Sequence, residues 1–123
     1  MNIKTSPHSV DDTVSRLREL LDARGTKLFA VIDHSAEAKA AGLELRNTKV
    51  VVFGNPRAGT PVIAAAPLAA LDLPLRVLVW DDNGETRIAY TEPAELAARY
   101  GLTDELAAPF AAIDGITDTL IEQ

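Results

Sequence analysis

Apolar residues recur along the chain at two spacings, one typical of helices and the other of strands. Four of them fall three or four positions apart and form one face of a helix: Val10, Val14, Leu17 and Leu21. Ser9 is the natural N-cap of this helix, and Arg24-Gly25 supplies its end. Further helices are predicted over residues 35–41, 61–71, 93–100 and 103–121. Ser35 and Thr103 are predicted to cap the first and the last of these.

Short apolar runs between the helices predict strands. Residues 27–33 (KLFAVID) and 49–53 (KVVVF) are continuous runs rich in β-branched side chains, which is typical of strands buried inside a sheet. Residues 75–80 and 86–91 flank the sequence DDNGE, in which Asn83-Gly84 favours a tight two-residue hairpin. A further short strand is predicted at residues 2–5.

The order of these elements indicates an α+β fold built as one two-layer domain over residues 1–123. Helices between the early strands favour parallel crossover connections, whereas the hairpin requires one antiparallel pair. We therefore expect a mixed β-sheet of 4–5 strands, with helices mainly on one face.

Composition narrows the function classes. The chain has no cysteine, which excludes disulfides, thiolate zinc sites and a thiol nucleophile. A formal net charge of −6 with scattered basic residues argues against nucleic acid as a partner. The N-terminus has no apolar core of a signal peptide, and the longest nearly uncharged run, residues 58–71, is too short to span a bilayer. We expect a cytoplasmic protein with no membrane partner.

Residues 54–60 (GNPRAGT) come close to the spacing of a phosphate-binding loop. The lysine of that motif is absent, Thr60 stands in its place, and Pro61 lacks an N–H group, so nucleotide triphosphate hydrolysis is disfavoured. Two interpretations stay open. The segment binds a small anion at a helix N-terminus with help from Arg57, or Asn55-Pro56 makes a turn and Thr60 caps the next helix, with Pro61 at its first position.

His34 follows a predicted strand and is the natural candidate for proton transfer, with Asp33 beside it. The alternative is a structural role for His34 in the turn before Ser35. If the strands ending at Asp33 and Phe53 are parallel, His34 and residues 54–60 lie at the same edge of the sheet. Trp80 belongs to the core, to a subunit interface or to a pocket wall. Nothing in the sequence has the spacing of a metal site, and no cofactor is expected.

Three segments together resemble a known family: IDHSAEAKAAG, VVFGNPRAGTPV and DLPLRVLVWDDNGETRIAYTEP. They are similar to the bacterial and archaeal family called domain of unknown function 302, over residues 28–120. The resemblance implies a small two-layer domain of helices and a sheet that forms a dimer. It implies no activity, because the family has none agreed, and therefore no catalytic residues.

The sequence leaves three hypotheses about function. The first is a homodimeric module that binds a small polar or anionic ligand between His34, Trp80 and the ligand-binding candidates Gly54, Asn55, Arg57, Gly59 and Thr60. The second is a small enzyme that uses His34 for proton transfer, with Asn55 or Thr60 polarising the substrate. The third is a protein–protein interaction domain without a small-molecule site.

Overall fold

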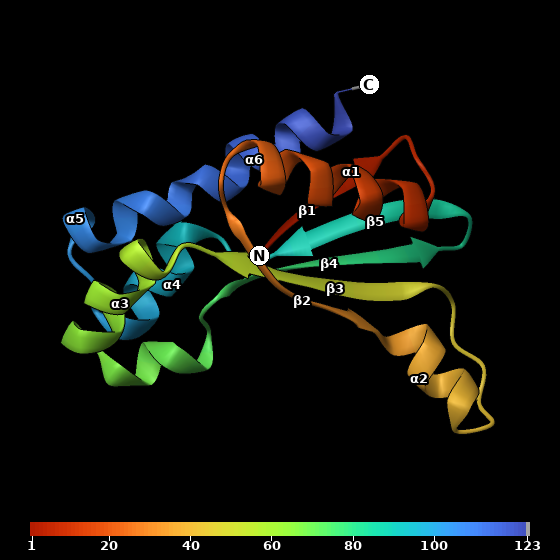
Figure 1. Cartoon of the computed structure of the whole chain (residues 1–123), viewed down its shortest axis with the longest axis horizontal. Coiled ribbons are helices and arrows are strands. Elements are labelled where there is room, and N and C mark those ends of the chain that lie inside the picture. Colours follow the sequence, from red (N-terminus) through yellow and green to blue (C-terminus); the bar gives the residue numbers. More distant parts are fainter. Residues whose placement is uncertain (123) are drawn as a thin grey trace.

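A computed structural model describes residues 1–122 and shows a five-stranded sheet with helices packed on one face and at one end (Figure 1). The elements in chain order are β1 (Asn2–Ser6), α1 (Val10–Ala23), β2 (Lys27–Asp33), α2 (His34–Ala40), β3 (Thr48–Gly54), α3 (Pro56–Ala65), the 3-10 helix η1 (Pro67–Leu71), β4 (Leu75–Asp82), β5 (Glu85–Tyr90), α4 (Pro93–Tyr100), α5 (Asp104–Ala107), the 3-10 helix η2 (Ala108–Ala111) and α6 (Ala112–Ile121). The α+β architecture expected from the sequence is confirmed.

The strand directions differ from the prediction. The strand order is β1-β5-β4-β3-β2, and every neighbouring pair is antiparallel, so the sheet is not mixed. The path of the chain after β2 accounts for the difference. Residues 34–47 join β2 to β3, and the seven-residue helix α2 lies beyond the ends of these strands instead of along a face of the sheet (Figure 1). The chain therefore turns at α2 and returns beside β2 as the antiparallel strand β3.

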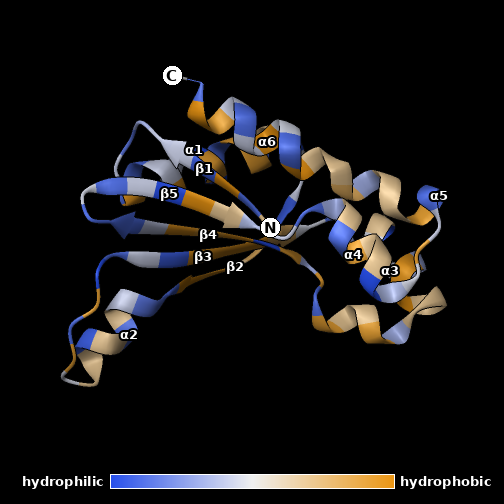
Figure 2. Cartoon of the chain, turned by 180° about the vertical axis from the view of Figure 1, so that it is seen from behind, coloured by the Kyte–Doolittle hydropathy of each residue, from blue (hydrophilic) through white to orange (hydrophobic). Residues whose placement is uncertain are grey.

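The core lies between the sheet and the pair of helices α1 and α6 (Figures 1 and 2). All four apolar residues of the predicted α1 face are buried, as expected from their spacing. They pack with alternate residues of the central strands and with one side of α6, among them Val51, Phe53, Val77, Ile88 and Ile113. The strand predicted over residues 49–53 is confirmed as β3, which lies inside the sheet between β4 and β2.

The other predicted buried strand, residues 27–33, occupies an edge. β2 pairs only with β3, and Phe29 and Ile32 remain 42% and 38% exposed. A continuous apolar run does not distinguish an edge strand from a central one, because both faces of β2 carry apolar side chains. The prediction of burial was therefore wrong, although the prediction of a strand was right.

The hairpin between β4 and β5 is confirmed at the predicted residues. Asn83 and Gly84 have φ angles of 54° and 94°, the left-handed conformations that a tight turn of this type requires. The Gly84 N–H donates a hydrogen bond to Asp81 Oδ1 at 2.7 Å. Leu78 pairs with Ala89 and Val79 with Ile88 across the two strands.

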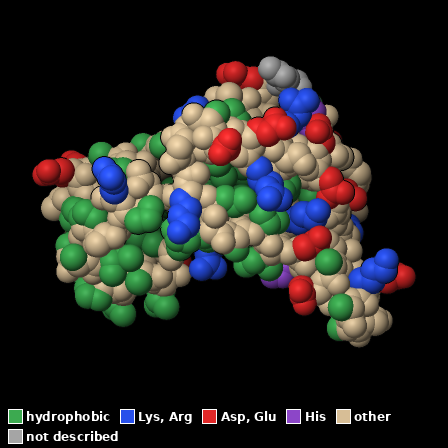
Figure 3. All heavy atoms as spheres, viewed as in Figure 1, with side chains coloured by type: hydrophobic (Ala, Val, Ile, Leu, Met, Phe, Trp, Pro, Cys, Tyr) green, Lys and Arg blue, Asp and Glu red, His purple; other side chains and the backbone are tan. Residues whose placement is uncertain are grey.

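A second, smaller apolar cluster joins α3, η1 and the segment before α6 at one end of the sheet. Val62, Ala69 and Phe110 are its buried members. Hydrophobic side chains also gather on the outside of this end, where Ile63, Leu68 and Leu71 are exposed (Figure 3). Among the described residues, none of the helices combines the length and hydrophobicity that crossing a lipid bilayer requires.

Asp72 ties η1 to α4. Its Oδ2 accepts hydrogen bonds from Arg99 Nη1 at 2.7 Å and from the Tyr100 hydroxyl. The hydrogen bond from Tyr100, followed by the one from Arg99, lowers the pKa of the Asp72 carboxyl below its ordinary value of 3.8. The charged form is thus the one that stabilises the fold.

We expect Asp72→Asn to lower the free energy of unfolding by about 1 kcal/mol at neutral pH, because the lost bonds are charge-assisted but partly exposed to water. A carboxyl whose pKa is lowered by folding adds to the free energy of unfolding at pH values above its unfolded pKa. This contribution is lost as the pH falls through the lower folded pKa. The difference from the wild type should therefore shrink below pH 3.8. Urea unfolding across this range measures it.

Glu44→Gln is the matched control, since Glu44 is exposed and should change the unfolding free energy little at any pH. A difference between the Asp72→Asn variant and the wild type that stays constant into strong acid would contradict a charge-dependent role for Asp72.

Candidate functional site

Residues 54–60 begin a helix instead of forming a loop. Gly54 ends β3, Asn55 is the N-cap of α3, and Pro56 occupies the first helical position. Asn55 Oδ1 accepts a hydrogen bond from the Arg57 N–H at 2.9 Å. The predicted cap at Thr60 was wrong, because Asn55-Pro56 offers the same cap-and-proline pattern five residues earlier and asparagine caps better than threonine.

Gly54 lets the end of β3 approach the start of β4 closely. A Cβ atom at this position would lie 3.3 Å from Pro74 Cβ, which is tighter than an ordinary contact. The chain therefore leaves the sheet beside the point where it later re-enters it, and α3 starts directly over this junction.

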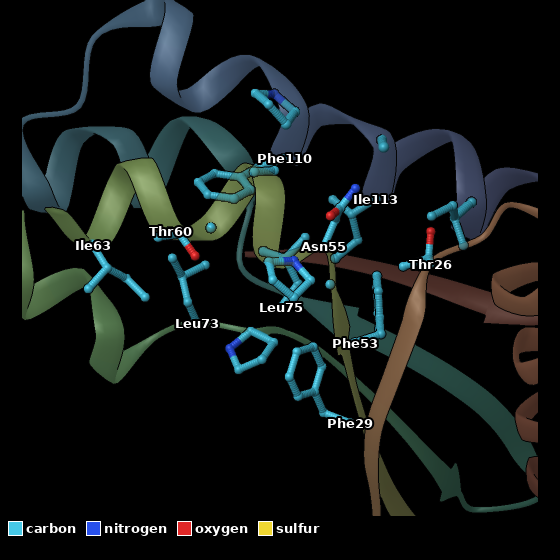
Figure 4. A pocket seen from close by; sticks show the side chains of 18 residues that line it. Thr26, Phe29, Phe53, Asn55, Thr60, Ile63, Leu73, Leu75, Phe110 and Ile113 are labelled. Atoms are coloured by element: carbon cyan, nitrogen blue, oxygen red, sulfur yellow. The ribbon is translucent and has the colours of Figure 1, made fainter. Parts of the chain in front are cut away.

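A cavity of about 420 Å³ opens at this junction, between the first turn of α3, the ends of β2, β3 and β4, and α6 (Figure 4). Its walls are mostly apolar and include Phe53, Leu75, Phe110, Ile113 and Ile116. None of the described residues that line it is charged, and its polar side chains are Thr26, Asn55 and Thr60. This volume lies in the range of small-molecule sites in proteins.

Four of the six ligand-binding candidates line this cavity: Gly54, Asn55, Gly59 and Thr60. Arg57 is exposed and does not belong to the lining. Trp80 lies toward the opposite end of β4, where it pairs with Thr48 and with Arg87. The structure therefore brings together the candidates that are adjacent in sequence and separates Trp80 from them.

His34 and Asp33 lie at the other end of the sheet. In the antiparallel register Lys27 pairs with Gly54, whereas Asp33 pairs with Lys49, so the expected common edge was wrong. His34 is the exposed first residue of α2. Its distance from the cavity follows directly from the strand direction.

Asp33, not Ser35, caps α2. Asp33 Oδ1 accepts hydrogen bonds from Ser35 Oγ at 2.6 Å and from the Ala36 N–H at 2.9 Å. These bonds, the one from Ser35 first, lower the pKa of the Asp33 carboxyl. Ser35 Oγ in turn accepts a hydrogen bond from the Thr48 N–H at 3.2 Å. Asp33 thus has a structural role at the beginning of the helix.

Sequence reasoning missed the walls of the cavity that come from distant segments. Thr26, Phe29, Phe110 and Ile113 lie on three different parts of the chain. Their sequence pattern indicates only strand or helix faces, and aromatic side chains on such faces are usually core residues. No local signal marks residues that meet only after the sheet and α6 have packed.

A separate polar cluster attaches β1 to α6. Lys4 Nζ donates to Thr117 Oγ1 at 2.6 Å and to Asp118 Oδ1 at 2.8 Å, and the Tyr90 hydroxyl donates to Asp114. Burial lowers the pKa of the Lys4 ammonium, but the hydrogen bonds with Asp118 and Tyr90 outweigh it, so the pKa is raised. Within residues 1–122, no group of three or more histidine or carboxylate side chains could hold a metal ion.

A family model described as domain of unknown function DUF302 matches residues 2–120. The chain belongs to this family. A crystal structure of the uncharacterised conserved protein DUF302 from Bacillus stearothermophilus matches 98% of this chain and 94% of its own, with a TM-score of 0.80 and 20% sequence identity. That DUF302 protein therefore has the same fold.

Curated relatives resemble the chain more closely in sequence. Two Brucella proteins, named fluoride-specific ion channel FluC 1 (Brucella suis biovar 1) and FluC 2 (Brucella melitensis biotype 1), are each 39% identical to it over 105 residues. The match covers 83% of this chain but only 41% and 39% of those proteins. The chain thus spans about two fifths of the length of these relatives, and the DUF302 domain occurs in them together with further sequence.

Gly59 offers a direct test of the cavity. A Cβ atom added there meets nothing within 4 Å, so Gly59→Ala should add helix propensity without a clash and raise the free energy of unfolding by up to about 1 kcal/mol. Chemical denaturation measures the change.

Gly115→Ala is the matched control, because Gly115 also lies in a helix with open space around it but does not line the cavity. Both variants should gain similar stability. A loss of stability in the Gly59→Ala variant alone would mean that the wall of the cavity is closed at this position.

Proposed function

We propose that this DUF302 protein is a homodimeric module that binds a small, uncharged and largely apolar ligand in the cavity beside α3. The observation that carries the proposal is a space of about 420 Å³ bounded by the buried side chains of Phe53, Phe110 and Ile113. A mostly apolar pocket of this size, open at one side and carrying a few polar groups, is typical of small-molecule sites.

The lining decides the chemistry of the ligand. The anionic ligand expected from the sequence required a cation, but Arg57 lies outside the cavity and the described lining residues are uncharged. An ion buried there would lose its hydration without gaining a partner, which is costly. A neutral ligand with apolar surface meets no such penalty and gains from leaving water.

Catalysis by His34 has less support. His34 is exposed at the end of the sheet opposite the cavity, and its neighbour Asp33 is engaged as a helix cap. Fluoride transport, which the names of the Brucella relatives state, is not proposed for this chain, because it spans only about two fifths of those proteins. A cytoplasmic location remains a prediction.

Filling the cavity should abolish binding. Gly59→Leu places a side chain into the open space beside α3, and we expect it to weaken the binding of 1-hexanol, a neutral apolar probe, at least tenfold. Two-dimensional NMR titration measures the affinity and should locate the shifts at Thr26, Gly54 and Ile113 in the unsubstituted protein.

Gly115→Leu is the control and should bind 1-hexanol as the wild type does. Absence of binding to the wild type, or shifts confined to other surfaces, would contradict the proposed function. Retained binding by the Gly59→Leu variant would place the ligand elsewhere.

The homodimer is supported by the sheet face that α1 and α6 leave uncovered. One row of residues crosses this face from edge to edge, and the pairing registers align its members as Ile3, Ala89, Leu78, Val50 and Ile32. All five are apolar, whereas the solvent face of an antiparallel sheet is ordinarily polar. Ile3 and Ile32 at the two ends of the row are 57% and 38% exposed, Val50 and Leu78 are partly exposed, and Ala89 is buried between its neighbours. Such a face favours burial against another apolar surface.

Charge and size favour a second copy of the same chain as its partner. On this face β4 begins with the exposed Arg76, and the hairpin end carries Asp82 and Glu85. Stacking β4 antiparallel on β4 of the partner about a two-fold axis brings Arg76 over the hairpin end of the partner, where Asp82 and Glu85 outnumber Arg87, the arginine that pairs with both. Five strands about 4.8 Å apart and about 20 Å long offer roughly 480 Å² from each copy, close to the ~1,000 Å² total of a specific interface.

A charge in the apolar row should separate the dimer. Ile32→Lys places an ammonium group on the proposed interface while leaving the core intact, since Ile32 lies on the uncovered face of an edge strand. We expect the wild type to be a dimer at micromolar concentration and the variant to be a monomer, as measured by light scattering.

Leu43→Lys is the control, because Leu43 is also apolar and is more exposed than Ile32, but lies after α2 and outside the sheet. It should remain dimeric. A monomeric wild type would contradict the homodimer, and a dimeric Ile32→Lys variant would place the interface on another surface.

A further inference from the structure

All three phenylalanines of the chain line the same cavity. Phe29 comes from β2, Phe53 from β3 and Phe110 from η2, so three separate segments each direct an aromatic ring to one place (Figure 4). On this basis we propose that the ligand carries an aromatic ring with one neutral hydrogen-bonding group, as in a phenol or naphthol. This inference rests on the proposed function.

The three rings surround the cavity at different depths. Phe53 and Phe110 are 1% and 5% exposed and form its inner walls, whereas Phe29 is 42% exposed and lies at its mouth. Figure 4 shows Phe110 on one side of the space and Phe29 on the other, with Leu73 and Leu75 between them. A ring placed here can meet the faces or edges of aromatic neighbours from more than one side, the arrangements in which aromatic pairs gain energy beyond the burial of their area.

The lining has few polar side chains, and of these only Asn55 has a hydrogen bond among the described residues. The hydroxyl groups of Thr26 and Thr60 form no hydrogen bond with any of the described residues, and Asn55 uses its Oδ1 for the cap of α3. A hydroxyl can donate or accept, so either threonine can bind a neutral hydroxyl group of the ligand. Since the lining holds no charge, the group that it recognises is neutral.

The volume sets an upper limit on the size of the ligand. At about 30 Å³ for each water molecule in the liquid, 420 Å³ corresponds to roughly 14 water-sized groups. One ring or two fused rings fit within this space. A two-ring alcohol is therefore a suitable probe.

The test compares 2-naphthol with its saturated counterpart, decahydro-2-naphthol, by isothermal titration calorimetry on the wild-type protein. The two probes share their carbon framework and hydroxyl group and differ in aromaticity. We expect 2-naphthol to bind about three- to tenfold more tightly, because only its ring interacts with the phenylalanines as an aromatic pair. Phe29→Leu should bring the two affinities close together while changing that of the saturated probe less than twofold.

Ile32→Leu is the matched control on the same strand, since Ile32 is similarly exposed but does not line the cavity, and it should keep the preference for 2-naphthol. Equal affinities in the wild type, or tighter binding of the saturated probe, would overturn the aromatic ligand and leave the proposed function standing. A preference that survives Phe29→Leu would overturn the role of the ring at the mouth. Failure of both probes and of 1-hexanol would overturn the proposed function itself.

Discussion

The structure depends on one contact at one end of the sheet, between the last residue of β3 and the residue before β4. β3 and β4 are neighbours, so the chain must leave the sheet at Gly54 and return to it at Leu75 within the spacing of adjacent strands. The absence of a side chain at Gly54 lets Pro74 pass at the required distance. The 20 residues between these points therefore leave the sheet and rejoin it at the same end. Within this segment α3 and η1 pack on each other and not on a face of the sheet.

The packing of this segment, residues 55–74, explains why a cavity exists. Phe53 and Leu75 end the core on the sheet side, and the small cluster around Val62 and Phe110 begins beyond them. Each cluster has its own buried members, and the two meet at Leu75, which packs against both, and where η2 with Phe110 leads into α6 with Ile113. The space between two separately packed clusters is filled by neither, and the first turn of α3, with Gly59, has no side chain there to fill it.

The sequence predicted those features that depend on neighbouring residues. The buried face of α1, the hairpin at Asn83-Gly84 and the cap at Thr103 all follow from side chains a few positions apart, and the structure confirms each of them. Gly54, Asn55, Gly59 and Thr60 were found together for the same reason. Strand direction could not be predicted in this way, because it depends on where residues 34–47 pack after they leave β2 and not on side chains a few positions apart.

The separation of His34 from the cavity follows from the antiparallel pairing of β2 with β3, and that of Trp80 from the antiparallel pairing of β4 with β3. It also shows why shifted pKa values are weak guides to function here. The carboxyls of Asp33 and Asp72 have lowered pKa values because each accepts hydrogen bonds that hold a helix in place. Structural networks of this kind perturb ionisation as readily as active sites do. The cavity was identified by its shape and its uncharged lining instead.

Phe29 shows how the edge strand contributes to this site. A bulge between Leu28 and Ala30 adds one residue to β2, so Leu28 and Val31 both face the core although they are three positions apart. Without the extra residue, a regular strand would turn one of these two side chains toward the uncovered face. Phe29 is the residue left without a partner in the register, and its ring lies at the mouth of the cavity with Lys27 Nζ 4.9 Å from its centroid. The irregularity that interrupts pairing at the edge of the sheet thus supplies the third aromatic wall without disturbing the packing of the core.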